Sequence, residues 1–432
     1  MHKFSLIQIF FLAFSIASLN VSSQSLQYSG LSFLSQNKDT ADLFPNTLKL
    51  EPQIRKLIFQ HLKASIPENS PLRLSASESF RDGTLSLIIA VDSERVTSIF
   101  FNNKCLNTYT LGAQVVVFSA QDQSILSIQP HTARKLHRDE PVNGDCKTRR
   151  PKVDLLRFGE MFYGLDSAQN EYQNYISLNE EELIAALEKE SLLNKSLASD
   201  ESILKPIISN ILDLTLEDLN NTNFYVGIDD VVIEDLALTQ MLGESEFSEN
   251  YEFSDFFGFN KEIYKVWAGQ QFSKWFSQSY NYPIIPFIKG RALGREIAIK
   301  FADSGEILNL NLPSLDFGFV IKVRGFKRVK LDESSHRELY GWAAFGEIEF
   351  HNVGIEMLTS IKLRNVLQEE INKGDTVDDW YNFNVSFGRV LKDYVENSKK
   401  LDKKWLKSTK LKRKDFNKHI NIVKKNIGLN DD

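Results

Sequence analysis

The chain has 432 residues, with 51 Lys or Arg against 57 Asp or Glu, and its formal net charge is −6. A length above about 300 residues excludes a single hydrophobic core, so we expect two or three domains. Two cysteines are too few for a cysteine-ligated metal site, and the acidic balance gives no reason to expect a nucleic-acid partner.

The first residues have the pattern of a secretory signal. His2 and Lys3 form a short polar start, and Phe4–Ala17 is an almost unbroken apolar run that is short for crossing a bilayer. Cleavage is expected near Ser23, because small residues precede that point. The alternative is an uncleaved N-terminal anchor. The sequence therefore predicts an exported protein, periplasmic or secreted, with no transmembrane segment in the mature chain.

Residues 24–46 are polar and Ser-rich, and they predict a loose leader. A helix is expected over 48–64, where apolar residues recur every three or four positions before two prolines. The strands expected over 84–101 and 109–118 each contain a run that is apolar on both faces, as in a sheet covered on both sides. These elements predict an N-terminal α+β domain over 47–151.

Cys105 and Cys146 are predicted to form a disulfide, because an even number of cysteines in an exported chain is typical of one. Cys105 lies in the turn between the two long strands. A further strand over 124–128 would run back toward that turn, and the loop after it would bring Cys146 close to Cys105.

The charge changes sharply in the middle of the chain. Residues 131–152 form a basic connector, whereas from residue 160 to residue 255 twenty-two acids face three lysines. Helices are expected over 178–197 and 202–219. We interpret residues 152–221 as an acidic helical insert or linker between two folded domains.

The acidic middle also raises the question of calcium, through Asp213, Glu217, Asp218, Asp229 and Asp230. Calcium loops require several oxygen ligands at alternating close spacing around a glycine turn, and that spacing is absent. A solvated acidic surface is the favoured interpretation.

The segment 247–282 holds thirteen aromatic residues. A helix is expected over 260–279, where large rings at three- and four-residue spacing make one broad apolar face. One interpretation is an aromatic platform for sugar or a groove for an apolar ligand. The favoured alternative is a helix that anchors a β-sheet, because burial is the usual fate of such rings. The candidate ligand-binding residues of the first interpretation are Trp267, Trp275, Tyr280 and Tyr282.

The second domain is expected to consist mainly of strands around this helix. A short helix is expected to end near Asn372, and a final helix is expected over 379–398. The expected strands are 224–234, 295–302, 307–312, 317–331, 339–350 and 356–363.

The strand 317–331 carries further candidate binding residues on the face opposite its apolar one. Cations at every second position beside the ring of Phe326 could track an anionic polymer. The favoured alternative is cross-strand pairing with Glu347 and Glu349. The cations concerned are Lys322, Arg324, Arg328 and Lys330.

Residues 399–425 contain twelve cations and two acids. Phe416, Ile420 and Val423 keep helical spacing, so part of this tail is expected to be an amphipathic helix. Three interpretations stay open: a solvated helix, a clamp onto the acidic middle, and a contact with an anionic envelope surface or glycan.

No catalytic signature is found: the chain lacks G-x-S-x-G, H-E-x-x-H, a phosphate loop and a glycine-rich dinucleotide turn. The sequence therefore predicts an exported, envelope-associated binding or assembly protein rather than an enzyme, with no cofactor and no metal, and it leaves a protein partner open. The alternative is a hydrolase acting on an envelope polymer through an aromatic cleft around 247–287. Glu262 and Glu296 are the acids nearest to that cleft in sequence.

The predicted fold class is α+β, with two mixed domains whose sheets are largely antiparallel and which are joined by the acidic helical insert. The predicted divisions are a signal peptide (1–23), a loose leader (24–46), an N-terminal domain with the disulfide (47–151), the insert (152–221), a C-terminal domain with the aromatic-rich helix (222–398) and a basic tail (399–432).

Overall fold

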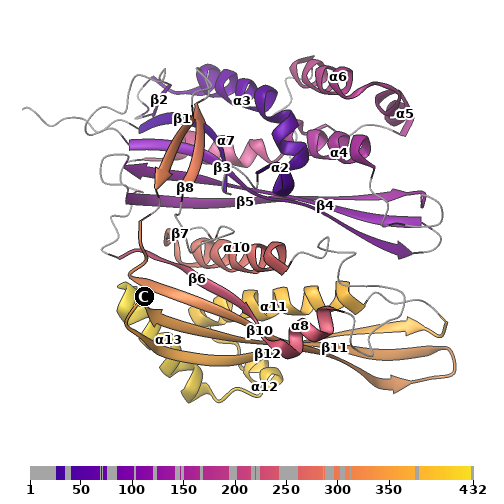
Figure 1. Ribbon diagram of the computed structural model, residues 1–432, viewed down its shortest axis with the longest axis vertical. Helices are drawn as coiled ribbons and strands as arrows, with labels where there is room; N and C mark the ends of the chain where they lie inside the picture. Colours follow the sequence, from indigo (N-terminus) through magenta and orange to yellow (C-terminus); the bar gives the residue numbers. More distant parts are fainter. Residues whose placement is uncertain are drawn as a thin grey trace, which may run out of the picture.

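The computed structural model is an α+β protein built from two mixed β-sheets and the helices that cover them (Figure 1). The predicted signal peptide and the aromatic residues 247–259 lie outside the described residues. The structure describes residues 26–34, 40–68, 70, 72–74, 85–101, 104–119, 124–141, 146, 150–165, 169–193, 202–215, 219, 224–242, 261–285, 287, 296–301, 307–311, 313–374 and 379–429.

The first module consists of one sheet and the helices on its outer side. β1 and β3 are parallel and are connected through helix α3, whereas β3, β4 and β5 form an antiparallel meander. Its elements are β1 (Leu26–Phe33), α2 (Thr40–Leu43), α3 (Pro45–Ser65), β2 (Leu72–Leu74), β3 (Leu85–Phe101), β4 (Lys104–Ser119), β5 (Ser124–Asp139), α4 (Pro151–Tyr163), α5 (Gln169–Ser177), α6 (Glu180–Leu193) and α7 (Leu204–Asp213).

The second module has the same order of elements. β6 and β10 are parallel and are connected through α10, whereas β10, β11 and β12 form an antiparallel meander. Its elements are β6 (Val226–Ile233), α8 (Asp235–Met241), α10 (Lys261–Tyr280), β7 (Ile284–Ile285), β10 (Phe317–Glu333), β11 (Arg337–Asn352), β12 (Glu356–Asn372), α11 (Asp379–Lys399), α12 (Lys403–Thr409) and α13 (Arg413–Ile427).

Three irregularities in strand pairing occur at the same places in both modules. The residue that has no opposite residue in the neighbouring strand is the fourth of β1 and of β6, the eighth of β3 and of β10, and the third of β5 and of β12. β-Bulges are specific local features rather than random defects. The second module is therefore a structural repeat of the first, and residues of the two can be compared one by one. The residues that the strand register skips are Ser29, Asp92 and Leu126 in the first module and Asp229, Arg324 and Leu358 in the second.

The modules are stacked so that α10 lies between the two sheets (Figure 1). The helices of the first module cover the opposite face of the first sheet. The hairpin of β8 (Glu296–Phe301) and β9 (Ile307–Asn311), which precedes β10 in the chain, extends the first sheet, because β8 pairs antiparallel with β1. The prediction that 295–312 belongs to the C-terminal sheet is therefore wrong.

The loose leader predicted for 24–46 is also wrong in part. Residues 26–33 form β1, which is buried along its whole length between β3 and β8, and 40–43 form α2. The polar Gln27, Ser29 and Ser32 are buried with the apolar residues, because both faces of the sheet are covered here. Composition alone therefore does not reveal this strand.

The predicted acidic insert is not a linker. Leu155, Phe158, Leu187 and Ile207, from α4, α6 and α7, belong to the same core as β1, β3 and α3. The apolar residues of these helices face the core of the first module, while the acids give the segment the composition that suggests a linker. The first part of the predicted basic connector (131–152) belongs to strand β5, which continues to Asp139.

Two elements near the C-terminus also differ from expectation. Residues 364–372 continue β12 instead of forming a helix, because they pair with β11 as far as Arg337. The basic tail forms α12 and α13, whose Trp405, Phe416 and Ile420 join the core of the second module. The tail therefore packs on its own module and does not clamp the acidic middle.

Candidate functional site

Helix α10 is buried on two sides, because it separates the two sheets. Toward its own sheet it presents Phe272, whose ring centroid lies 5.0 Å from that of Phe319 and 5.8 Å from that of Tyr394. Toward the first sheet it presents polar side chains, among them Lys274 and Gln278. The junction between the modules is therefore polar and buried.

The centre of this junction is an ion pair between Lys274 and Asp92, with 2.7 Å between Nζ and Oδ1. Both side chains are almost fully buried. Gln114 Nε2 donates to Asp92 Oδ2 at 2.7 Å, and Ser93 Oγ donates to Oδ1 at 2.9 Å. Lys274 also donates to Thr132 Oγ1 at 3.3 Å. Several hydrogen-bond partners satisfy each charge, so the ion pair can be buried. It fixes α10 on the first sheet and with it the position of one module relative to the other.

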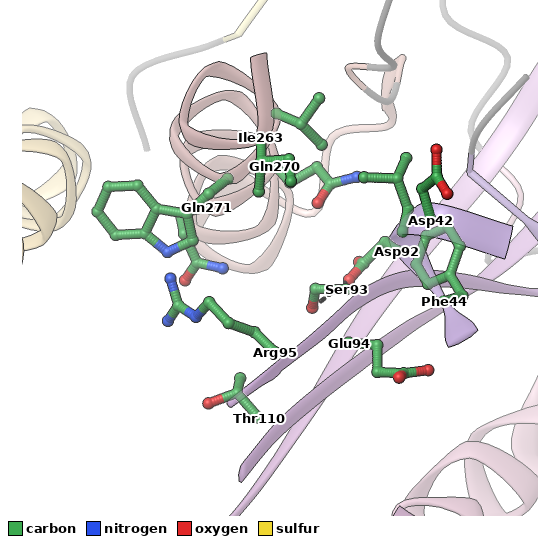
Figure 2. Close-up of a pocket in the computed structure, with 13 residues that line it drawn as sticks. Asp42, Phe44, Asp92, Ser93, Glu94, Arg95, Thr110, Ile263, Gln270 and Gln271 are labelled. Atoms are coloured by element: carbon green, nitrogen blue, oxygen red, sulfur yellow. Dashed lines mark hydrogen bonds between the residues drawn. The ribbon is translucent and has the colours of Figure 1, made fainter. Parts of the chain in front are cut away.

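A pocket of about 100 Å³ lies beside this ion pair, between β3, α10 and the end of α2 (Figure 2). Its apolar wall includes Phe44, Ile263 and Val266. The guanidinium carbon of Arg95 lies 5.4 Å from the centre of the Trp267 ring, a cation–π distance. The polar residues of the lining are Asp42, Asp92, Ser93, Glu94, Arg95, Thr110, Gln270 and Gln271.

Burial is the main cause that lowers the pKa of Arg95 to about 10, and the nearby cation Arg134 lowers it further. Arg95 remains charged at neutral pH, since the lowered value is still far above 7. The pocket thus presents a charged guanidinium and an indole face to whatever occupies it.

Glu94 has a structural role at the same place. Its carboxylate accepts the backbone N–H groups of Asn46 at 3.0 Å and Thr47 at 2.7 Å, and it also accepts Asn46 Nδ2 at 2.7 Å. These groups belong to the first turn of α3, which has no side-chain cap of its own. Burial raises the pKa of Glu94, and these hydrogen bonds lower it in part.

The predicted aromatic candidates do not form one platform. Trp267 and Trp275 both lie against α11 near Gly388, and Trp267 also lines the pocket. The Tyr280 hydroxyl lies 2.6 Å from Ser398 Oγ, and the Tyr282 hydroxyl donates to the Phe224 carbonyl at 3.2 Å. Of the four, only Trp267 faces the pocket.

The four strand cations do not share one face either, because the bulge at Arg324 and Gly325 reverses the alternation of β10. Gly325 adopts φ +148, which favours glycine. Lys322 pairs with Glu349 at 2.6 Å and Arg324 with Glu347 at 3.6 Å on the outer face. Beyond the bulge, Arg328 lies on the core side with Phe326.

Arg328 pairs with the buried Asp379 at 2.9 Å, and Lys330 pairs with Glu333 at 2.7 Å and with Glu338 at 2.6 Å. The geometry therefore agrees with the favoured alternative, in which Glu347 and Glu349 pair with cations of the neighbouring strand.

A second buried cluster lies between β5 and α4. Glu160 pairs with Arg157 at 3.0 Å and with Lys135 at 3.4 Å, and His137 Nε2 lies 3.7 Å from its carboxylate. His131, on the same strand, lies 3.1 Å from Asn210 Nδ2 of α7. These contacts attach the helices to the sheet, and the two histidines do not converge on one site.

Sequence reasoning missed the residues that define the junction: Asp92, Arg95 and Lys274. A signal existed in β3, because charged residues follow directly after the apolar run Leu85–Val91. Lys274 gave no comparable signal, since a lysine on a helix is usually solvated.

The disulfide between Cys105 and Cys146 is present, with 5.4 Å between the Cα atoms. Disulfides of this kind are typical of secreted proteins. Among the described residues, none of the helices is both long and apolar enough to cross a membrane. The described ranges also contain no group of three or more His, Cys, Asp or Glu side chains that could hold a metal ion.

Neither the known protein-family models nor the curated proteins contain a match to this chain.

Proposed function

We propose that this protein is an exported, non-catalytic binding or assembly protein of the cell envelope, and that the pocket between its modules holds a side-chain-sized group of the ligand. The observation that carries the proposal is the position of the Arg95 guanidinium beside Trp267 in a small pocket with an apolar wall. Pockets with a mostly apolar lining and a few placed polar groups are the usual form of ligand sites.

The chemistry of the wall favours a small acid with a planar or aliphatic body. A carboxylate would pair with Arg95 and be fixed by its fork of donors, whereas the body would lie against Trp267 and Val266. A cavity of about 150 Å³ accepts a benzene ring in other proteins. The somewhat smaller pocket here suits the end group of a larger ligand.

The acids around the pocket support binding over hydrolysis of an envelope polymer. Glycoside hydrolysis commonly uses two carboxylates on either side of the bond that is cleaved. Here Asp92 pairs with Lys274, and Glu94 accepts hydrogen bonds from the first turn of α3, so Asp42 is left without a second carboxylate among the described lining residues. Glu262 is not among the described residues that line the pocket, and the side chain of Glu296 lies outside the described part of the structure.

The binding test uses isobutyrate and isovalerate as probes, whose short carbon bodies suit a pocket of about 100 Å³, with isovaleramide as the neutral comparison. We expect the two acids to bind saturably by calorimetry and by tryptophan fluorescence, and the amide to bind at least tenfold more weakly. Arg95→Gln should weaken the acids at least tenfold, and Trp267→Leu should weaken all three probes.

The matched control is Lys327→Gln, because Lys327 occupies the position in β10 that Arg95 occupies in β3. Its binding of the acids should be unchanged. Equal binding of acids by the wild type and by Arg95→Gln, or no binding of either acid, would overturn the small-acid site.

Export is supported by the disulfide and by the apolar N-terminal run. N-terminal sequencing of the mature protein should begin near Gln24. A mature chain that still carries residues 1–23 would instead indicate the uncleaved anchor.

The basic tail is a second contact in this proposal, for an anionic envelope surface or glycan. The apolar side of α13 is used in the core, so only its exposed cations, such as Lys414, Lys418 and Lys425, remain for such a contact. Replacing these three by glutamine should abolish salt-sensitive binding to phosphatidylglycerol vesicles and leave the melting temperature unchanged. Unchanged vesicle binding would show that the tail serves only the core.

A further inference from the structure

The stacking of two repeats covers one sheet face and leaves its counterpart open. In the first module, the row of Ser93, Gly112 and Thr132 lies under α10, where Ser93 and Thr132 contact Lys274. The equivalent row of the second module lies on the outer face of β10, β11 and β12. There α8 lies against Gly325 at the edge of β10, and the Ser408 carbonyl of α12 accepts a hydrogen bond from Arg364 of β12. Between these contacts Lys327, Val329 and Val366 are exposed.

The position of α8 is shown by Gln240, whose side-chain amide exchanges two hydrogen bonds with the backbone of Phe326 at 2.8 and 2.9 Å. This amide replaces a strand partner at the point where β6 has ended. The helix therefore protects the sheet edge and leaves the face itself accessible.

The open face combines an apolar patch with cations. Val329, Leu331 and Val366 are 38 %, 45 % and 40 % exposed. A Cβ added at Gly341 would meet both Leu331 and Val366, so these side chains flank a shallow position on the sheet. Neighbouring apolar side chains that are exposed on a sheet face are typical of an interaction surface.

The cations of this face are in excess of its acids. Glu347 and Glu349 are held by Arg324 and Lys322. Arg324 also lies 3.6 Å from Glu234, which follows directly after β6. Lys327 and Lys362 are exposed, and within the described ranges no acid lies within ion-pair distance of either. At the bulge, Arg324 replaces Asp92 of the first module. Arg324 already has carboxylate partners within this chain, so Lys327 and Lys362 are the cations that suit this face to carboxylates of a partner.

We propose that the outer face of β10, β11 and β12 docks an amphipathic helix of a partner protein, which crosses these strands as α10 crosses those of the first sheet and presents carboxylates to Lys327 and Lys362. A second copy of this chain does not fit through its equivalent helix. That helix is α3, whose exposed Lys49 and Lys56 already pair with Glu180 and Glu188 of α6. Lysines facing this cationic sheet would be repelled.

The test uses two synthetic peptides with the sequence of α10, residues 261–280, in which Tyr264, Phe272 and Phe276 are replaced by glutamine for solubility. One peptide retains Lys274, and the other carries Lys274→Glu. We expect the Lys274→Glu peptide to bind the full-length protein at least fivefold more tightly by fluorescence anisotropy. Its amide-shift footprint should cover β10 to β12 and spare the pocket at Arg95.

The double variant Lys327→Glu/Lys362→Glu should reverse the preference between the peptides, and Val366→Ser should weaken both. The matched control is Lys403→Glu/Lys404→Glu, exposed cations of α12 that lie off this face; it should change neither affinity. Equal affinities for the two peptides, or affinities that the charge reversal leaves unchanged, would overturn the proposal. So would phosphatidylglycerol vesicles that bind through Lys327 and Lys362 when neither peptide binds, since the occupant would then be a membrane surface.

Discussion

Helices α3 and α10 hold equivalent positions in the two modules, yet they are buried differently. α3 faces its sheet with Ile54 and Ile58 and presents Lys49 and Lys56 to the outside. α10 faces its own sheet with Phe272 and the neighbouring sheet with Lys274. In each module the crossover helix therefore buries one face against its own sheet. Stacking of the modules buries a second face of α10 against the first sheet.

The polar side of α10 differs from that of a solvent-exposed helix, because it faces the first sheet. A charge that faces water needs no partner, whereas one that faces a sheet must be satisfied within the protein. Lys274 finds Asp92, which is the residue without a strand partner at the bulge of β3. The irregularity of the repeat thus supplies the acceptor for the inter-module ion pair.

The largest effect should come from breaking this ion pair. Lys274→Met leaves Asp92 buried without its cation and should lower the free energy of unfolding by about 3–5 kcal/mol, measured by urea denaturation. Lys322→Met removes a partly exposed pair of the second sheet and should cost at most about 1 kcal/mol. Adding Asp92→Leu to Lys274→Met should restore much of the loss. A cost below about 1 kcal/mol for Lys274→Met would mean that the ion pair does not hold the modules together.

The next effect concerns the hairpins of the two modules. In the first module Cys105 of β4 is bonded to Cys146, whereas the end of the second hairpin is held by non-covalent contacts, among them the Lys330–Glu333 ion pair and the backbone hydrogen bond from Ser334 to Arg337. Cys105→Ser combined with Cys146→Ser should cost about 3–4 kcal/mol in the chain-entropy model, since the closed loop spans 41 positions. Hydrogen exchange should show the loss in β4 and β5 and leave β10 and β11 protected. Loss of protection in both hairpins would show that the modules unfold as one unit.

The local sequence pattern was sufficient to predict those helices and strands that bury one face. The helix predicted over 379–398 is α11, and the strands expected at 317–331 and 339–350 are β10 and β11. The Cys105–Cys146 disulfide is also confirmed, because the expected reversal of the strands brings the two residues together.

Pattern failed where contacts distant in sequence decide the structure. β1 alternates polar and apolar residues, and it became recognisable as a strand only through its pairing with β3 and β8. The bulge at Gly325 moves Arg328 to the opposite face from Arg324, and a single bulge cannot be read from alternation. Lys274 and Ser93 lie 181 positions apart, so the site at the junction could not be predicted from local spacing.

A smaller effect is expected from the buried histidine of each module. Burial lowers the pKa of His131 and of His419 to about 4. His419 lies between the Tyr394 hydroxyl at 2.9 Å and Thr359 Oγ1 at 3.0 Å. Each histidine binds a proton in the unfolded chain near pH 6.5 but in the folded protein only near pH 4, so stability is full above 6.5 and falls as the pH drops through this window.

Each histidine should account for on the order of 1–3 kcal/mol of this loss. The measurement is the free energy of unfolding between pH 7 and pH 4.5 for the wild type, His131→Gln and His419→Gln. Each variant should have a flatter pH profile than the wild type. A slope that neither substitution changes would assign the acid sensitivity to other groups.

The smallest effect is expected at the tip of the second hairpin, which ion pairs hold where the first module has its disulfide. Lys330 contacts Glu333 and Glu338, and Lys373 Nζ lies 2.5 Å from Glu333. The hydrogen bond from Lys330 is the main cause that lowers the pKa of Glu333 to about 2, with a further contribution from Lys373. Because the folded value is depressed, the contribution of Glu333 is present above its unfolded pKa of about 4.3 and is lost as the pH falls toward 2.

These side chains are solvent-exposed, so screening keeps the contribution small and sensitive to salt. The protection factor of the amides near Ser334, which corrects exchange for its intrinsic pH dependence, should therefore fall as the pH drops from about 4.3 to about 2, and also in about 1 M salt, while the core of β10 stays protected. Glu333→Gln should remove most of the pH dependence at this tip. In the first module, the protection factor near Cys105 should stay constant over the same range, because the disulfide does not titrate there. Parallel fraying of both tips in acid would show that the disulfide and the ion pairs are not the groups that hold them.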